Sequence, residues 1–236
     1  MTQAAPDNRP VPASLADAVD WVAYDSLLFA STDSPFRAAV SPGDPGLALI
    51  VGENASGKSL FFRVLAQKIR AGGALPVTLS IRERAGAGGF DMSRMRQAMI
   101  FGDETDQSTG ATSVKAIAAA FKNLDRPDGS LLGLDEPELG LSDGYARALG
   151  EYIGAQSLTV PDVCAGVVVV THSRSLVRGL LAGYAKTPTF VVCGSQTADA
   201  DAWLDDDEVR SVEELLALPD VGLARFRQVH ALLKEP

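Results

Sequence analysis

The amino-acid sequence predicts an α/β protein in which helices cover a layered sheet. Continuous apolar runs of strand length occur at residues 47–51, 131–134 and 166–171, a pattern typical of strands that are buried on both faces. Between these runs, apolar residues recur with the spacing of an amphipathic helix. The alternation of the two patterns along the chain favours helices packed on a sheet.

The N-terminal quarter is expected to add an antiparallel β region. Residues 1–13 contain prolines at positions 6, 10 and 12 and few apolar residues, which predicts a mobile tail. Short apolar stretches follow at 21–24, 27–30 and 36–40, separated by polar residues, and they predict short antiparallel strands. A turn is expected at 41–46, directly before the buried strand at 47–51.

The middle of the chain continues the alternation. The spacing of apolar residues after position 59 predicts a helix that ends at Gly72 and Gly73. Strands are expected at 77–81 and 98–101, joined by a Gly- and Arg-rich loop at 82–96. A helix at 114–124 then precedes the strand at 131–134.

The last third of the chain predicts a helix capped by Ser142, a strand at 166–171, a helix at 176–181 and a final strand at 190–192. An acidic segment covers residues 198–208, and two helices are expected at about 211–217 and 220–234. The sequence therefore predicts one domain over residues 14–236, with a C-terminal helical segment at about 205–236.

Composition excludes several classes of protein. The net charge of -9 and the pI near 4.7 disfavour broad contact with nucleic-acid phosphates, so nucleic acid is expected only indirectly, if at all. Cys164 and Cys193 read as small buried hydrophobic residues, and two histidines are too few for a zinc site. The start of the chain does not resemble a signal peptide, and no apolar run approaches the ~20 residues of a membrane span. We therefore expect a cytoplasmic protein without membrane insertion.

A phosphate-binding motif provides the main chemical evidence. Residues 52–59 match G-x-x-x-x-G-K-[ST] at every fixed position, between a predicted strand and a predicted helix. Glycines let successive backbone N–H groups point at phosphate oxygens, while Lys58 reaches the β- and γ-phosphates and Ser59 ligates magnesium. The motif predicts ATP and Mg²⁺ as cofactors, bound by Gly52, Glu53, Asn54, Ala55, Ser56, Gly57, Lys58 and Ser59.

A carboxylate pair follows the apolar strand at 131–134. Asp135 is placed to hold magnesium, and Glu136 is placed to orient or deprotonate an attacking water. The alternative is that both residues belong to an ordinary solvated turn. With the phosphate-binding motif upstream, the pair indicates hydrolysis and disfavours a phosphotransferase.

Three segments in this order, 52–59, 134–138 and 170–173, resemble the ABC-type ATPases, which belong to the P-loop NTPases. The resemblance implies that Lys58 assists catalysis, that Asp135 is the Walker B magnesium residue and that Glu136 is the catalytic base. It also implies that His172 is the switch histidine that senses the γ-phosphate. Alone, His172 would more often be a structural polar residue.

The signature segment of this family has a degenerate counterpart at residues 107–111. The resemblance carries over Ser108 and Gly110, which in this family contact the γ-phosphate bound by the other subunit of a dimer. The alternative is that Ser108 simply caps a helix. The resemblance thus implies an ATP-dependent homodimer.

The chain departs from the family in several places. Little sequence separates Lys58 from Ser108, which implies a reduced helical subdomain and leaves the Q-loop residue open between Gln97, Glu104 and Gln107. Ser142 stands where many relatives have aspartate in the D-loop. Tyr24 could stack on adenine or pack in the core. The resemblance covers about residues 15–195.

These features favour an ATP-hydrolysing switch whose nucleotide-driven dimerisation is read by an unidentified partner protein. One alternative is a nucleotide-gated regulatory or assembly module with little turnover. Another is the ATP-binding subunit of a transporter, which the short insertion disfavours.

Overall fold

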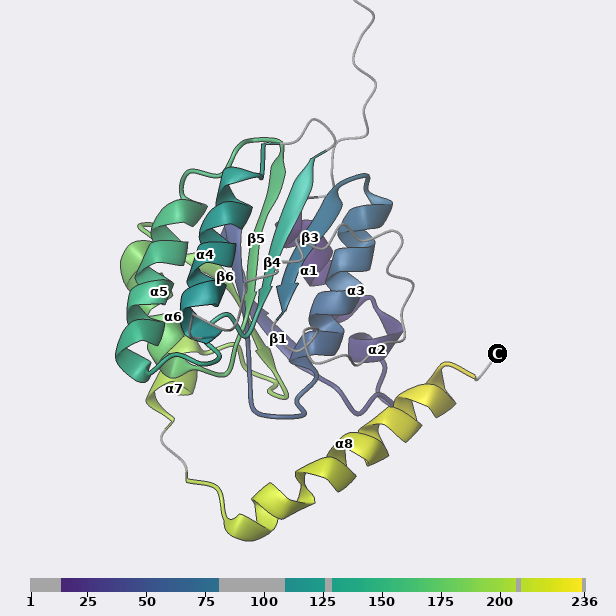
Figure 1. The fold of residues 1–236 in the computed structure, drawn as a ribbon. Coiled ribbons are helices and arrows are strands. Elements are labelled where there is room, and N and C mark those ends of the chain that lie inside the picture. Colours follow the sequence, from purple (N-terminus) through teal and green to yellow (C-terminus); the bar gives the residue numbers. More distant parts are fainter. Residues whose placement is uncertain (1–13, 81–108, 126–128, 207–208, 235–236) are drawn as a thin grey trace, which may run out of the picture.

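The computed structural model describes residues 14–80, 109–125, 129–206 and 209–234. In this part of the chain, a six-stranded sheet lies between two layers of helices (Figure 1). The strand order is β1-β6-β2-β5-β4-β3, and every neighbouring pair is parallel except β1 with β6. The strands are β1 Ala38–Ser41, β2 Asp44–Val51, β3 Leu75–Ser80, β4 Ser130–Asp135, β5 Cys164–Val170 and β6 Pro188–Cys193.

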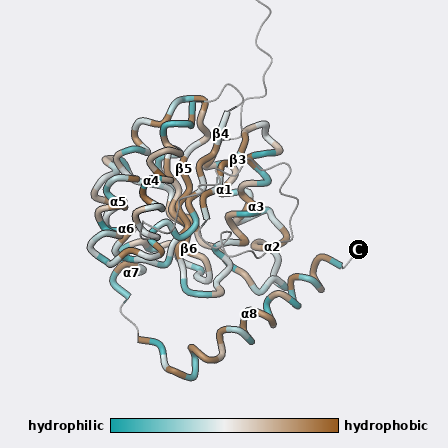
Figure 2. Tube along the Cα trace, in the orientation of Figure 1, coloured by the Kyte–Doolittle hydropathy of each residue, from teal (hydrophilic) through white to brown (hydrophobic). Residues whose placement is uncertain are grey.

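Helices cover both faces of the sheet, because the strands are apolar on both sides. The first face packs against α4 (Thr109–Lys122), α5 (Asp143–Ser157), α6 (Arg174–Gly183) and α7 (Ala200–Asp205). The second face packs against α1 (Leu15–Tyr24), α2 (Leu27–Ala30) and α3 (Lys58–Ala71). Figure 2 shows the hydrophobic strands between these two layers. The α/β layered sheet expected from the sequence is therefore present.

The N-terminal region differs from the expectation of several antiparallel strands. Residues 21–24 and 27–30 lie in α1 and α2, and only β1 runs antiparallel to its neighbour. In α1 the buried residues Leu15, Ala18, Val19 and Val22 follow helical spacing, and the Ser14 hydroxyl caps the helix by accepting from Asp17 N–H. The expectation was wrong because it grouped short apolar runs and missed this longer periodicity.

The strand β2 begins earlier than expected. The turn predicted at 41–46 is shortened because β1 extends to Ser41 and β2 starts at Asp44. Asp44 is held by Tyr184, whose hydroxyl donates to Oδ1 at 2.5 Å, and by Lys186, whose Nζ lies 2.9 Å from Oδ2. These contacts with residues distant in the sequence hold the start of β2 in place, although the prolines and glycines of residues 41–46 predict a turn.

The C-terminal region also differs from the expectation. The two helices expected at 211–217 and 220–234 form one continuous helix, α8 (Val212–Leu232), with Pro219 inside it. Ser211 and Glu214 form a capping box at the start of α8, which stabilises the helix. The helix therefore continues through Pro219, although proline cannot donate one of the internal hydrogen bonds. The acidic segment at 198–208 contains α7, which Asp199 caps.

The remaining elements lie close to their expected positions, including the helix that starts after Ser142, although the Ser142 side chain makes no capping hydrogen bond. The expected tail at 1–13, the loop at 82–96 and the strand at 98–101 lie outside the described residues. Among the described helices, none combines the length and the apolar character that a bilayer crossing requires.

Candidate functional site

The predicted motifs meet at one edge of the sheet. The parallel strands β2, β5 and β4 are neighbours, and the register places Val170 of β5 level with Ile50 of β2 and with Asp135 of β4. The carboxyl ends of parallel strands meet at the same edge, where open α/β sheets bind ligands. The loop at 52–57, the pair Asp135 and Glu136, and His172 therefore emerge side by side.

The loop between β2 and α3 has the backbone of a phosphate cradle. Gly52, Ala55 and Gly57 have positive φ angles of 143°, 60° and 100°. A side chain at Gly52 would bring its Cβ to 2.4 Å from the carbonyl oxygen of Cys193 on β6, so only glycine fits there. The close approach of loop and sheet supplies a fixed base for the turn.

Lys58 begins α3 and is 7% exposed. Its ammonium donates to the carbonyl oxygens of Gly52 and Glu53, each at 2.8 Å. The positive charge is thus held inside the loop, beside the N-terminal end of α3, where the helix dipole also favours an anion. Both effects concentrate positive potential where phosphate groups would lie.

Oxygen donors suitable for Mg²⁺ occupy the adjoining positions. Ser59 follows Lys58 in the first turn of α3, and Asp135 is the last residue of β4. Ser80, at the end of β3, lies opposite Asp135 in the register, with its hydroxyl 3.4 Å from Oδ2. A hydroxyl and a carboxylate are hard ligands that match Mg²⁺, which keeps water and phosphate oxygens in its other positions. The residues present therefore fit the ion.

Glu136 is held in an unusual conformation at the centre of this edge. Its φ angle is 51°, a left-handed value that is rare outside glycine, and its side chain is buried. Its N–H donates to the carbonyl of Val170 at 2.8 Å, which joins the ends of β4 and β5. The backbone is thus fixed so that the carboxylate turns toward His172.

His172 follows β5, and its Nδ1 lies 3.3 Å from Oε1 of Glu136. The hydrogen bond to Glu136 raises the pKa of His172 above its ordinary value, against the opposing effect of partial burial. The two side chains form a coupled acid and base on neighbouring strand ends. Such a pair can exchange a proton with a water molecule placed between them and a phosphate.

A second carboxyl group lies behind this pair. Glu138 is 8% exposed, and its Oε1 accepts a hydrogen bond from the Thr171 hydroxyl at 2.5 Å. The same hydroxyl accepts from Ser173 N–H at 2.8 Å. Burial raises the pKa of Glu138, and the Thr171 hydrogen bond opposes this effect only in part. Glu138 therefore fixes the loop that carries His172.

Comparisons with known proteins give little beyond this geometry. No family model matches the chain, and no curated protein matches it. One solved structure that it resembles is the crystal structure of Cdc6p from Pyrobaculum aerophilum, with 16% identity and a TM-score of 0.34. The match covers 80% of this chain and 48% of that one, so this chain spans about half the length of that protein.

The remaining expected site residues lie outside the described residues or, in the case of Gly110, in α4. Ser108, Gln97, Glu104 and Gln107 lie outside the described residues. Gly110 lies in α4, where an added Cβ would meet the side chain of Leu141 at 2.5 Å and the carbonyl oxygen of Gly140 at 3.1 Å. Close packing against Gly140 and Leu141 of the same chain therefore explains why position 110 is a glycine.

Tyr24 ends α1, and its ring is largely exposed. Its hydroxyl accepts a hydrogen bond from Val40 N–H at 3.3 Å, which ties α1 to β1. The exposed ring contradicts packing of Tyr24 in the core, and stacking on adenine stays a prediction.

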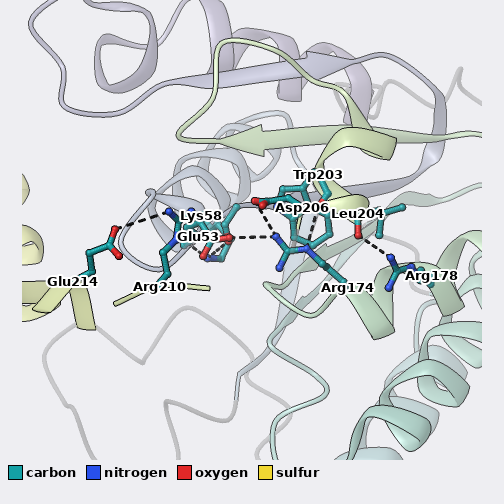
Figure 3. A network of polar contacts seen from close by, with 10 residues as sticks. Glu53, Lys58, Arg174, Arg178, Trp203, Leu204, Asp206, Arg210 and Glu214 are labelled. Carbon is teal, nitrogen blue, oxygen red and sulfur yellow. Dashed lines mark hydrogen bonds and ion pairs between the residues drawn. The ribbon is translucent and has the colours of Figure 1, made fainter. Parts of the chain in front are cut away.

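Two arginines that the sequence analysis did not single out contact the loop at 52–57. Arg174 extends from the start of α6 to Glu53 at 3.5 Å and to Asp206 at 3.3 Å, and it stacks on the Trp203 ring (Figure 3). Arg225 of α8 donates to the carbonyl of Ala55. The sequence held a weak signal for Arg174, because a basic residue in the first turn of a helix opposes the helix dipole and is favoured there when an acidic side chain lies near it.

Proposed function

We propose that this protein is a Mg²⁺-dependent ABC-type ATPase. The observation that carries the proposal is the contact of Glu136 with His172 at the carboxyl edge of the sheet, beside a loop that holds the Lys58 ammonium. A simple nucleotide-binding protein needs the loop and its lysine. It does not need a buried carboxylate on a strained backbone, paired with a histidine from the next strand.

In this proposal each residue has one task. Lys58 and the loop N–H groups would neutralise the β- and γ-phosphates, and Ser59 and Asp135 would hold a magnesium ion, which would stabilise negative charge on the phosphates. Glu136 accepts a proton from the attacking water, and His172 positions Glu136 and senses the γ-phosphate. Pre-positioned dipoles at the start of α3 stabilise the charge of the transition state.

We further propose that two chains close over two ATP molecules and that a partner protein reads the closed state. The position of α4 supports this coupling. Its N-terminal turn begins directly after Ser108, and Gly110 packs against Gly140 and Leu141, shortly after Glu136. A second subunit that contacts Ser108 would therefore press on the segment that carries the catalytic base.

The variant Glu136→Gln tests the enzymatic part of the proposal. We expect it to bind ATP normally but to release phosphate about 100-fold more slowly or worse, because an amide cannot accept a proton. At a protein concentration where the ADP form of this variant is monomeric in sedimentation, ATP should shift the variant to the dimer. Glu151→Gln, an exposed change of the same type on α5, is the matched control and should keep full turnover. Normal phosphate release by Glu136→Gln would refute the assignment of the base.

A regulatory or assembly module with little turnover is the second candidate, and the degenerate signature at Ser108 and Gly110 favours it. The two candidates differ in phosphate release by the wild-type protein in the presence of its partner. Turnover that stays negligible while ATP still drives dimerisation would support the regulatory module. A transporter subunit would instead have to bind a membrane protein.

A further inference from the structure

The helix α8 has two mostly apolar stripes, and the body of the protein contacts one of them in the C-terminal half of the helix. The first face, here called the inner stripe, consists of Leu218, Arg225, Val229 and Leu232. Leu232 is buried, Val229 packs against the core on the α3 side of the sheet, and Arg225 contacts Ala55. These contacts hold the C-terminal half of α8 against the protein.

The second face, here called the outer stripe, points away from these contacts. Leu216 and Phe226 are 73% and 66% exposed. Figure 2 shows hydrophobic residues along the whole length of this helix. The outer stripe consists of Val212, Leu216, Pro219, Leu223, Phe226, His230 and Leu233.

The spacing of the outer stripe identifies the kind of partner. Its members follow each other alternately four and three residues apart, which is the repeat of a helix that packs along another helix. The repeat persists from one end of the 21-residue helix to the other, a length of about 32 Å. A single apolar pocket or a flat surface would not require such a regular repeat.

The charges along α8 favour a second copy of the same helix in antiparallel orientation. Acidic residues lie in the first half, with Glu213 and Asp220 exposed, and basic residues lie in the second half, with Arg227 and Lys234 exposed. An antiparallel pair places the acidic half of each helix along the basic half of the other. A parallel pair would place like charges together.

We propose that α8 pairs with α8 of a second copy as a short antiparallel coiled coil that forms without nucleotide. The repeat gives a symmetric register in which Leu216 faces Phe226 of the other copy. On the solvent side of this seam, Glu213 lies near Arg227 of the other copy, and Asp220 lies near its own counterpart. Such an interface is isologous and closes into a dimer.

The pairing is separate from the proposed ATPase function. It needs neither a γ-phosphate nor the loop at 52–59, so a chain with Lys58→Ala should still pair through α8. If the α8 dimer does not form, the proposed ATP-driven closure can still occur. If ATP-driven closure does not occur, the α8 dimer can still form. Because the seam is about three heptads long, we expect a reversible dimer that depends on protein concentration.

Sedimentation velocity of the full chain with EDTA and no nucleotide tests the interface. The wild type should show a concentration-dependent monomer–dimer equilibrium, which Leu216→Glu or Phe226→Glu should shift to monomer by at least about tenfold in dissociation constant. Gln228→Glu adds the same charge at an exposed position outside both stripes and should leave the equilibrium unchanged. Both outer-stripe side chains are exposed, so at concentrations where the wild type is also monomeric the variants should keep its circular dichroism and melting temperature.

Charge and cross-linking variants test the orientation. Glu213→Lys should weaken the dimer, while Asp220→Asn should strengthen it by removing the repulsion between two symmetric carboxylates. A chain with Leu216→Cys mixed with a chain with Phe226→Cys should form a disulfide dimer, and either chain alone should not. The native Cys164 and Cys193 are buried and give a low background. A folded wild-type chain that stays monomeric without nucleotide would overturn the interface, and efficient cross-linking of Leu216→Cys with itself would overturn the antiparallel register.

Discussion

His172 Nδ1 lies 3.3 Å from Oε1 of Glu136. Glu136 directly follows β4 and His172 lies just after β5, so this contact joins the ends of two neighbouring strands. Glu136 is buried on a backbone with a φ angle of 51°, whereas His172 remains partly open to solvent. The exposed partner of the pair can meet a phosphate and change the environment of the buried one. This relationship makes His172 a reporter of the site.

The pKa of His172 should lie above the ordinary histidine value of about 6.5, because Glu136 stabilises the charged imidazole. The pair therefore stabilises the fold fully below about pH 6.5, and this contribution is lost as the pH rises through the raised pKa. NMR titration of the imidazole signals checks the pKa directly. The chain has two histidines, and His230→Gln assigns the signals.

Glu136→Gln should lower the pKa of His172, because the amide carries no charge. Glu151→Gln, which does not contact the histidine, should leave it unchanged. An identical His172 titration in wild type and Glu136→Gln would contradict the pairing of these two residues.

Lys58→Ala should weaken the binding of Mg-ATP by about 10- to 100-fold or more, because it removes a charge-assisted contact to the β- and γ-phosphates. Titration calorimetry measures the affinity. Lys68 lies in the last turn of the same helix, α3, over the Trp21 ring. Lys68→Ala serves as the control for the loss of a lysine. Equal affinities of wild type and Lys58→Ala would exclude the loop as the nucleotide site.

Glu138→Gln should reduce the loss of unfolding free energy that the wild type shows as the pH rises. Burial raises the pKa of Glu138, so its stabilising contribution is complete below the ordinary glutamate pKa and is lost as the pH rises through the raised value. Each unit of pKa displacement corresponds to about 1.4 kcal/mol in the free energy of unfolding. The amide keeps the acceptor for the Thr171 hydroxyl and removes the titration.

Urea denaturation between pH 4 and pH 8 checks the effect of Glu138→Gln, with Glu151→Gln on α5 as control. The difference in unfolding free energy between Glu138→Gln and wild type should grow with pH. A difference that is constant with pH would mean that Glu138 does not titrate in this range.

Mixing two inactive chains tests the proposed shared nucleotide site. Ser108→Arg should block closure over ATP through its bulk and charge, and Lys58→Ala should remove the phosphate site. A heterodimer of the two variants retains up to one intact composite site, so the mixture should regain part of the phosphate release that each variant lacks alone. Wild-type turnover per molecule that is independent of protein concentration, from a chain that remains monomeric with ATP, would refute the shared site.

The sequence alone determined the alternation of strands and helices and the residues of the motif that predicts a phosphate-binding loop. Gly52, Lys58 and Asp135 could be identified because motif spacing and the surrounding apolar runs reflect local backbone requirements. The same local reasoning misread residues 21–30 as strands, since short apolar runs fit either element until the longer helical period of α1 is considered.

The tertiary structure decided which of these residues meet. The pairing of β4 with β5, which are separated by α5 along the chain, placed Glu136 beside His172 and the Thr171 hydroxyl beside Glu138. It also brought Arg174 and Arg225 to the phosphate-binding loop. Local sequence patterns encode helix and strand periods, whereas long-range contacts depend on strand order and register, which are fixed only when the whole core packs.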